Sequence, residues 1–337
     1  MTNSPQQPDP RLVQFMRDQK LASADESGAW TALTGGVSSD IWRVDLRKGS
    51  FCVKCALPKL KVARDWQAPT IRNTYEWEWL NFAYRQMPAV VPRPIAHDGA
   101  MEAFVMAFLD GAHYPVWKQL LLDGVIQEKT AADVGQALVA LHAASARDPG
   151  LPGRFKTDDI FYSIRLEPYL VATAQAHPEL AAPLNRLVQQ TLNRHVALVH
   201  GDVSPKNILV GPNSPVFLDA ECAWFGDPAF DVAFCLNHFL LKSVARPAWR
   251  GALMSLFDVF SRRYLTGVDW EAPADLERRA AALLPALFLA RVDGKSPVEY
   301  LQTEAERDTV RQFARPLILT PPATLAAVSS AWSAAVA

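Results

Sequence analysis

Residues 198–236 read LVHGDVSPKNILVGPNSPVFLDAECAWFGDPAFDVAFCL. Short apolar runs alternate here with polar loops, and the Pro-Asn-Ser-Pro turn at 212–215 separates two of these runs. The pattern predicts a β-hairpin with polar side chains at the ends of its buried strands. These side chains are Asp202, Asn207 and Asp219. Two carboxylates and an amide supply the oxygen ligands that a hard divalent cation prefers, and one carboxylate can accept a proton.

The spacing of these three residues matches a site for phosphoryl transfer. In the kinase template a catalytic Asp precedes a metal-binding Asn by five residues, and a second metal-binding Asp follows downstream. Asp202 and Asn207 have that separation, and Asp219 comes one hairpin later. Asp and Asn also form turns and caps, but three such residues in this register favour Asp202 as the catalytic base, with Asn207 and Asp219 as metal ligands.

The motif around Asp202 resembles a known superfamily. His200-Gly201-Asp202 stands where protein kinases have His-Arg-Asp, and this is similar to the aminoglycoside phosphotransferase and choline kinase superfamily. Asp219-Ala220-Glu221 and the segment that follows resemble 5-methylthioribose kinase, which implies that Glu221 joins Asp219 near the metal. A solvated loop charge is the alternative for Glu221. The loop 202–207 departs from that kinase, which lacks this Asn.

An earlier hairpin has the features of a phosphate-binding turn. The small residues Gly35, Gly36, Ser38 and Ser39 precede a strand pair that ends in Phe51-Cys52-Val53-Lys54. Backbone N–H groups in such a turn can approach phosphates closely, and a lysine on a flexible stem suits two neighbouring phosphates. Cys52 shares a strand face with Lys54 and is expected to line the adenine pocket. Alone, Lys54 also fits a solvent-exposed edge strand.

The helix predicted at 72–85 offers a partner for Lys54. Large apolar residues recur along it at helical spacing. Glu76 shares a stripe with two apolar residues and is expected to face inward and pair with Lys54. Glu78 is the second candidate, and Arg72, one turn before Glu76, can compete for its carboxylate.

The sequence predicts an α+β protein with two lobes and a protein-kinase-like fold. Strands are expected at 90–95 and 103–106, followed by a hinge at 107–111 whose backbone at Met106 and Phe108 meets the adenine edge, as in related kinases. The small antiparallel-sheet lobe, with an N-terminal arm and helix, spans 1–108. The larger, mainly helical lobe spans 109–337 and holds the catalytic loop and the acceptor site, with ATP in the cleft.

Near the C-terminus the resemblance implicates Arg291 in acceptor binding. In 5-methylthioribose kinase a pair of arginines before a glycine turn binds the sugar, and here Ala290 occupies the first position, so only Arg291 remains. The alternative is that Arg291, in the last turn of a helix expected at 273–292, complements the helix dipole and faces solvent.

Three further polar residues have simpler expected roles. Asp231 is expected to cap the helix that contains Phe234, because Asp satisfies backbone N–H groups at helix starts. His142 is expected to be a structural core residue, because its segment has no other polar partner. Lys206 either touches a phosphate or is solvated, and solvation is favoured.

Composition excludes several classes of protein. The 337 residues carry a net charge of −1, which does not favour a nucleic-acid or membrane-surface partner. The N-terminus lacks the apolar core of a signal peptide, and the apolar run at 280–290 contains Pro285 and is too short to span a bilayer. Four cysteines fit a reduced, cytoplasmic protein, and the lone Cys52-x-x-Cys55 completes no zinc site. A homodimer is left open.

The expected activity is transfer of the γ-phosphoryl group of ATP, with Mg²⁺, to a hydroxyl of a small molecule. The resemblance favours a sugar-like, 5-methylthioribose-like acceptor. An aminoglycoside, choline or another alcohol is the alternative within enzymes. A catalytically silent nucleotide-binding module is the alternative from another class.

Overall fold

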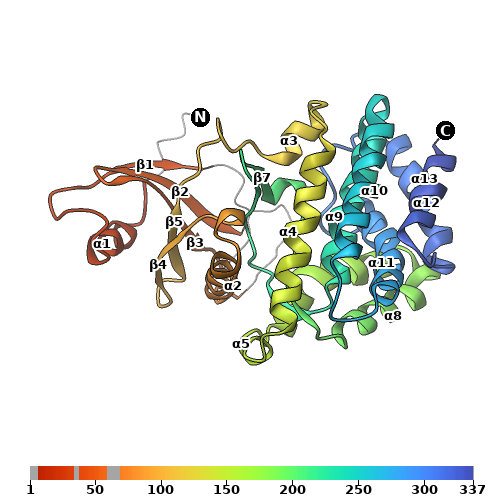
Figure 1. The fold of residues 1–337 in the computed structure, drawn as a ribbon, viewed down its shortest axis with the longest axis horizontal. Helices are drawn as coiled ribbons and strands as arrows, with labels where there is room; N and C mark the ends of the chain where they lie inside the picture. Colours follow the sequence, from red (N-terminus) through yellow and green to blue (C-terminus); the bar gives the residue numbers. More distant parts are fainter. Residues whose placement is uncertain (1–6, 34–37, 59–68, 337) are drawn as a thin grey trace. The chain divides into compact units, whose positions relative to one another are not determined.

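The computed structural model describes residues 7–33, 38–58 and 69–336. The chain forms two compact units, Met1–Asp110 and Gly111–Ala337. The first contains a five-stranded sheet and the second is mainly helical (Figure 1). This arrangement confirms the predicted α+β class.

The first unit is built on an antiparallel sheet with the strand order β1-β2-β3-β5-β4. Its strands are β1 (Ala29–Ala32), β2 (Ser39–Leu46), β3 (Gly49–Ala56), β4 (Pro94–Asp98) and β5 (Ala103–Ala107). Trp42 and Val44 of β2 are buried, as the alternation of apolar and polar residues predicts. They belong to one apolar cluster with Leu12, Phe15 and Met16, the buried residues of helix α1 (Pro10–Asp18).

Helix α2 (Arg72–Gln86) agrees closely with the helix expected at 72–85 and packs against β4 and β5. The strand expected at 90–95 was wrong at its start. Residues Pro88–Val90 form a 3-10 turn, and β4 begins only at Pro94. Prolines at 88 and 92 explain the delay, because proline lacks the N–H that a ladder requires.

The second unit is a helical assembly with two small strand pairs. Its helices are α3 (Trp117–Leu122), α4 (Glu128–Ala146), α5 (Leu151–Arg154), α6 (Asp158–Phe161), α7 (Ala172–Ala176), α8 (Ala181–Leu192), α9 (Ala229–Ala245), α10 (Arg250–Thr266), α11 (Pro273–Asp293), α12 (Glu304–Leu319) and α13 (Leu325–Ala335). A π-helical segment, Tyr162–Val171, joins α6 to α7. The short helix α5 lies in the segment between α4 and α6.

Helix α9 forms the centre of this second unit. All of its residues are buried, and it packs against α10 and α11 (Figure 1). A helix that is apolar on every side must be covered on every side. The polar residues that α9 carries are therefore held in the interior, where each needs a partner.

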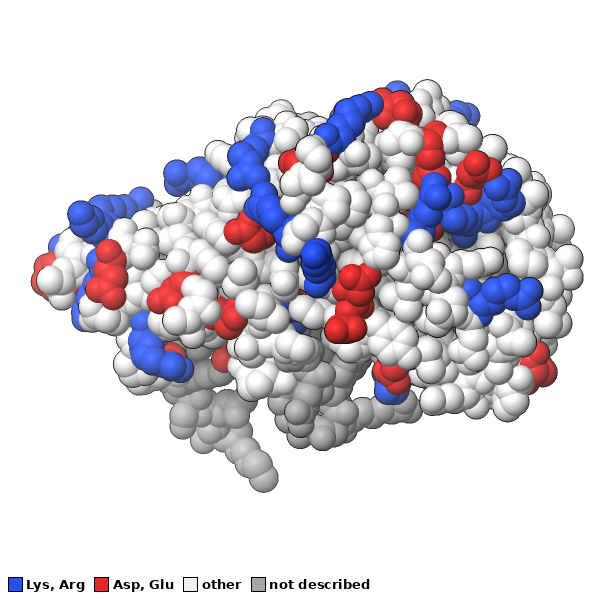
Figure 2. All heavy atoms as spheres, turned by 90° about the horizontal axis from the view of Figure 1, so that it is seen from below, with Lys and Arg blue, Asp and Glu red and all other residues white. Residues whose placement is uncertain are grey.

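Charged side chains of both signs are interspersed on the face of the molecule that Figure 2 shows. Among the described residues, no helix combines the length and apolar character that crossing a bilayer requires.

Candidate active site

The predicted hairpin is present and brings two of the predicted metal ligands together. Strand β7 (Ile208–Val210) pairs with β8 (Pro215–Phe217), with Ile208 opposite Phe217. The pairing continues one step further, because the N–H of Leu218 donates to the carbonyl of Asn207 at 2.9 Å. Asn207 and Asp219 therefore lie at the same end of the hairpin.

His200 ties this hairpin to the catalytic loop. It follows β6 (Ala197–Val199), which pairs with β9 (Trp224–Gly226). Its Nε2 lies 3.0 Å from the carbonyl oxygen of Leu218, and its Nδ1 accepts the N–H of Asp202 at 3.1 Å. Burial lowers the pKa of His200, so the ring is neutral and Nε2 carries the proton. His200 thus fixes the loop of Asp202 beside the segment that carries Asp219.

Gly201 is required by the geometry of this loop. Its φ is +77°, a left-handed conformation that side chains disfavour. A Cβ atom there would lie 2.6 Å from the carbonyl oxygen of Cys222 and 2.7 Å from its Cβ. Only glycine fits between His200 and Asp202.

Asp231 has a different role from the one expected, and the helix-cap prediction was wrong. Its carboxylate accepts the backbone N–H groups of His200 at 2.7 Å and Gly201 at 2.8 Å. Asp227 instead accepts the N–H of Ala229 at the start of α9, at 3.0 Å. Asp231 therefore holds the catalytic loop against α9.

His142 is buried, as expected, but its environment was not foreseen. It has polar partners from distant segments, with Nδ1 2.6 Å from the Tyr264 hydroxyl and Nε2 3.2 Å from Asp231 Oδ2. His142 thereby supports the carboxylate that holds the catalytic loop.

Asp202 is buried and held through one of its two carboxylate oxygens. Arg165, from the π-helical segment, approaches Oδ2 through Nη2 at 2.8 Å and donates from Nε to the carbonyl of Gly201 at 2.6 Å. Lys206 Nζ lies 3.2 Å from the same Oδ2, while 49% of its side chain stays exposed. Lys206 therefore combines a partner at the site with contact to solvent.

The other oxygen of Asp202 is available. Oδ1 is buried and has no hydrogen-bond partner in the described part of the chain. Burial raises the pKa of Asp202, but the charges of Arg165 and Lys206 outweigh this effect and lower the pKa below its ordinary value. An ionised carboxylate with one free oxygen is suited to accept a hydrogen bond from a hydroxyl group.

The donor set at the hairpin end fits a hard divalent cation. The amide Nδ2 of Asn207 donates to the carbonyl of Asp202 at 3.1 Å, which leaves Oδ1 as the amide's oxygen ligand. Asp219 has φ of +69°, an uncommon backbone conformation that Asp tolerates better than most residues. Glu221 lies two residues beyond it, in a turn. In the described residues, no cluster of three or more His, Cys, Asp or Glu could hold a metal, so such a site depends on Asn207.

In the first unit, Lys54 of β3 pairs with Glu76 of α2. Lys54 Nζ lies 2.8 Å from Oε1 and 2.7 Å from Oε2, and both side chains are buried. This resolves the choice between Glu76 and Glu78. Arg72 does not compete, because its guanidinium donates to the carbonyl oxygens of Ser38, Leu57 and Pro69.

The remaining residues expected to contact nucleotide lie on or beside the same sheet. Cys52 of β3 stands opposite Met106 of β5, and burial raises the pKa of its thiol to about 12. Phe108 follows β5, with the guanidinium of Arg43 4.6 Å from its ring centre. Ser38 and Ser39 are buried. Gly35 and Gly36 lie outside the described residues.

Arg291 is buried rather than facing solvent. Its side chain bonds to the Tyr169 hydroxyl at 3.1 Å and to Ser296, and only 8% of the residue is exposed. It also borders a pocket of about 680 Å³, together with Glu299 and Arg307. The alternative of a solvent-facing charge at a helix end does not describe this side chain.

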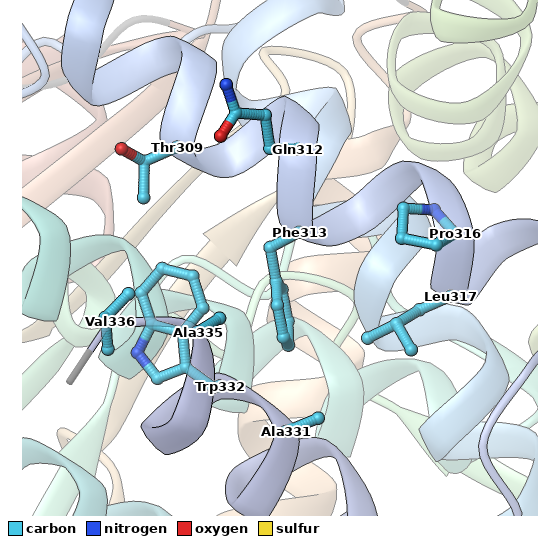
Figure 3. Close-up of a pocket in the computed structure, with 9 residues that line it drawn as sticks. All are labelled: Thr309, Gln312, Phe313, Pro316, Leu317, Ala331, Trp332, Ala335 and Val336. Atoms are coloured by element: carbon cyan, nitrogen blue, oxygen red, sulfur yellow. The ribbon is translucent and has the colours of Figure 1, made fainter.

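A second pocket, of about 330 Å³, lies between α12 and α13 (Figure 3). Phe313, Pro316, Leu317 and Trp332 make most of its wall apolar. It contains none of the predicted site residues, and its lining has no titratable group suited to phosphoryl transfer.

Comparison with known proteins agrees with this constellation. The sequence profile described as "Phosphotransferase enzyme family" matches residues 29–276. A methylthioribose kinase of Pectobacterium carotovorum is 26% identical over 302 residues, which is 77% of this chain and 73% of that protein.

Two solved structures show the likeness of fold. An ethanolamine kinase of Plasmodium vivax aligns with 97% of this chain and 86% of its own, with a TM-score of 0.55 and 14% identity. An amicoumacin kinase in complex with AMP-PNP, Ca²⁺ and amicoumacin aligns with 94% of this chain and 95% of its own, with a TM-score of 0.53 and 14% identity.

Proposed function

From the premise that this chain belongs to the phosphotransferase enzyme family, we propose that it transfers the γ-phosphoryl group of ATP to a hydroxyl group of a small molecule. Family membership confirms the identification of a phosphotransferase made from residues 198–236. The methylthioribose kinase relative supports a sugar-like acceptor. The AMP-PNP complex of a protein with a similar fold supports an adenine nucleotide as the donor.

One observation carries the proposal. Asp202 keeps Oδ1 without a partner in the described residues, although the group is buried and its Oδ2 is held by Arg165 and Lys206. A buried acceptor left open is costly unless a ligand completes it. A hydroxyl group of the acceptor would donate to this oxygen.

The proposed transfer exchanges one bond of the γ-phosphorus for another. The acceptor oxygen forms a bond to the γ-phosphorus while the bond from that phosphorus to the bridging oxygen of ATP breaks, which releases ADP. Asp202 orients the hydroxyl and receives its proton late in the transfer. Positioning and charge stabilisation supply most of the rate enhancement.

The other predicted residues would act on the phosphates. Lys54, braced by Glu76, would hold phosphates nearer the adenosine, and Ser38 and Ser39, at the start of β2, would approach them. Asn207 and Asp219 would hold Mg²⁺, with Glu221 as a further candidate. When bound, the ion neutralises charge on the transferring phosphoryl group.

The test uses the purified chain in two steps. ATP should raise its melting temperature in the presence of Mg²⁺ more than in its absence, and ADP release should then be measured over a panel of alcohols, with 5-methylthioribose included. Asp219→Asn should abolish the Mg²⁺-dependent part of the shift. Stabilisation by ATP with no ADP release from any alcohol would favour a silent nucleotide-binding module instead.

A further inference from the structure

Helix α9 presents a buried polar stripe that the proposed transfer does not use. Phe234, His238 and Lys242 follow one another at intervals of four residues, so they lie on one face of the helix. The ring centres of Phe234 and His238 are 5.6 Å apart. Side chains on a helix tilt toward its N-terminus, which directs Lys242 back toward His238.

Lys242 is a buried cation that no carboxylate neutralises. Only 1% of the residue is exposed, and within the described ranges it forms no ion pair and its ammonium group donates no hydrogen bond. Its ammonium nitrogen lies 4.9 Å from the centre of the Tyr300 ring. The nearby Lys118 is already paired with Glu299. Burial, and then the charge of Lys118, lowers the pKa of Lys242 to about 7.

Two neighbouring groups also have unused polar atoms. Nε2 of His238 and Nε of Arg291 are buried without hydrogen-bond partners in the part of the chain that the structure describes. His238 Nδ1 lies 3.3 Å from the Tyr300 hydroxyl. If this hydroxyl donates to Nδ1, the proton of the neutral ring is on Nε2, which then is a donor with no acceptor. Arg291 contacts hydroxyl and carbonyl groups but no carboxylate.

This cluster of Lys242, His238 and Arg291 is connected to the catalytic carboxylate. Arg291 donates to the hydroxyl of Tyr169, and the guanidinium carbons of Arg291 and Arg165 lie 5.5 and 5.9 Å from the Tyr169 ring centre. Arg165 in turn holds Asp202. Burial lowers the pKa of His238 well below its ordinary value, and the charges of Lys242, Arg291 and Lys206 lower it further.

We propose that the acceptor alcohol is an anion, and that Lys242, Arg291 and His238 bind its carboxylate or phosphate group while Asp202 receives its hydroxyl. The proposal rests on the proposed function, and it narrows the class of acceptor. It assigns Lys242 and His238 to a binding site, and it gives Arg291 a ligand of definite charge.

The charge balance decides among the acceptor classes. Two buried cations without carboxylates are unfavourable in an empty site, and a bound anion removes that cost. Arginine and lysine are also the side chains that bind carboxylates and phosphates in proteins. A cationic acceptor such as choline or an aminoglycoside would instead meet like charges at this cluster, which costs binding energy.

The first arm of the test measures binding without turnover. With Mg²⁺ and ADP present in excess, malonate and inorganic phosphate are titrated against the whole chain, and the melting temperature is followed. At least one of these anions should raise the melting temperature of the wild type and leave that of Lys242→Met unchanged. Without an anion, Lys242→Met should melt at or above the wild-type temperature, because it removes an unpaired buried charge. Lys129→Met, an exposed lysine of α4, is the matched control and should respond like the wild type.

The second arm compares acceptors that differ in charge. ADP release is measured with ribonate, ribose 5-phosphate, 5-methylthioribose and choline. One of the two anionic sugars should have a kcat/KM roughly tenfold or more above the neutral sugar, since hydrogen bonds to charged groups are stronger than those to neutral groups. Lys242→Met and Arg291→Ala should remove this preference through the acceptor KM and leave the KM for ATP nearly unchanged.

The outcomes separate the two proposals. Turnover of a neutral or cationic alcohol without preference for an anion would overturn the anionic acceptor and leave the kinase intact. Equal stabilisation of wild type and Lys242→Met by both anions would overturn the anionic acceptor, and so would the absence of stabilisation of either protein. Both conclusions hold whatever rates of ADP release the acceptors give. Absence of both ATP binding and ADP release, with anion stabilisation retained, would remove the kinase and leave an anion site.

Discussion

Two buried ion pairs, one in each unit, differ in what they leave available. Glu76 presents both carboxylate oxygens to Lys54, at 2.8 and 2.7 Å. Asp202 presents only Oδ2 to Arg165 and Lys206, and its Oδ1 lacks a partner among the described residues. Both pairs are charged and buried, but both oxygens of Glu76 lie within 2.8 Å of the lysine nitrogen, whereas the cations contact only one oxygen of Asp202.

The comparison shows that the role open to a buried carboxylate depends on how many of its oxygens contact a cation. A carboxylate whose oxygens both face one lysine fixes that lysine in place, and this is a positioning role. A carboxylate with one oxygen paired to cations stays ionised and oriented, and its second oxygen can accept a hydrogen bond from a hydroxyl group. Under the proposed function, the first arrangement would support phosphate binding and the second would support proton acceptance.

The largest expected effect is on kcat, and it tests the role of Asp202 and its Oδ1 atom. Asp202→Asn keeps the size of the side chain but removes its charge, so kcat should fall by roughly 10²- to 10⁴-fold, the usual contribution of a general base. ATP binding, measured by calorimetry, should stay within a few-fold of the wild type. Asp227→Asn is the matched control, because Asp227 is equally buried and is paired with Arg279. It should lower the melting temperature and spare kcat. Comparable kcat in Asp202→Asn and wild type would remove Asp202 as the base.

The next effect tests what keeps Asp202 ionised. Burial raises the pKa of this carboxyl and Arg165 lowers it, so Arg165→Met should let the pKa rise. The base is then protonated at a higher pH, and the acid limb of the profile of kcat/KM against pH should move upward. An unshifted acid limb, in a variant that still folds, would show that Arg165 does not set the charge of Asp202.

The smallest expected effect is on the KM for ATP, and it tests the pair of Lys54 and Glu76. Glu76→Gln weakens the contact that holds Lys54, because a charged hydrogen bond becomes a neutral one. The KM for ATP should rise by about tenfold, equivalent to about 1.4 kcal/mol, and the acceptor KM should change little. Glu78→Gln, two residues away on the same helix, should leave both constants near their wild-type values. Equal effects of the two variants would assign Glu76 to the stability of α2 instead.

Much of the site was predictable because its parts are local. Asn207 and Asp219 flank one hairpin, whose turn at 212–215 brings its ends together, and Asp202 lies only five residues before Asn207. The pairing of Lys54 with Glu76 was one of two options, because Glu76 and Glu78 lie on different stripes of the helix and each stripe also carries apolar residues. The role of Asp231 was mistaken because its distance from the helix start suggested a cap, whereas its carboxylate accepts from N–H groups some thirty residues earlier in the chain.

The sequence by itself determined the α+β class, the order of sheet and helices, and the spacing of the phosphoryl-transfer residues, because these depend on periodicity and short-range turns. The tertiary structure alone decided which buried charges meet. Arg165 reaches Asp202 across 37 positions of the chain, and Lys242 lies over the ring of Tyr300, which comes from a distant segment. No local sequence pattern predicts such pairs, because the sequence around a lysine in an apolar helix is the same whether or not a carboxylate packs against it in the fold. Only the packing around α9 shows that Lys242 forms no ion pair with a carboxylate among the described residues.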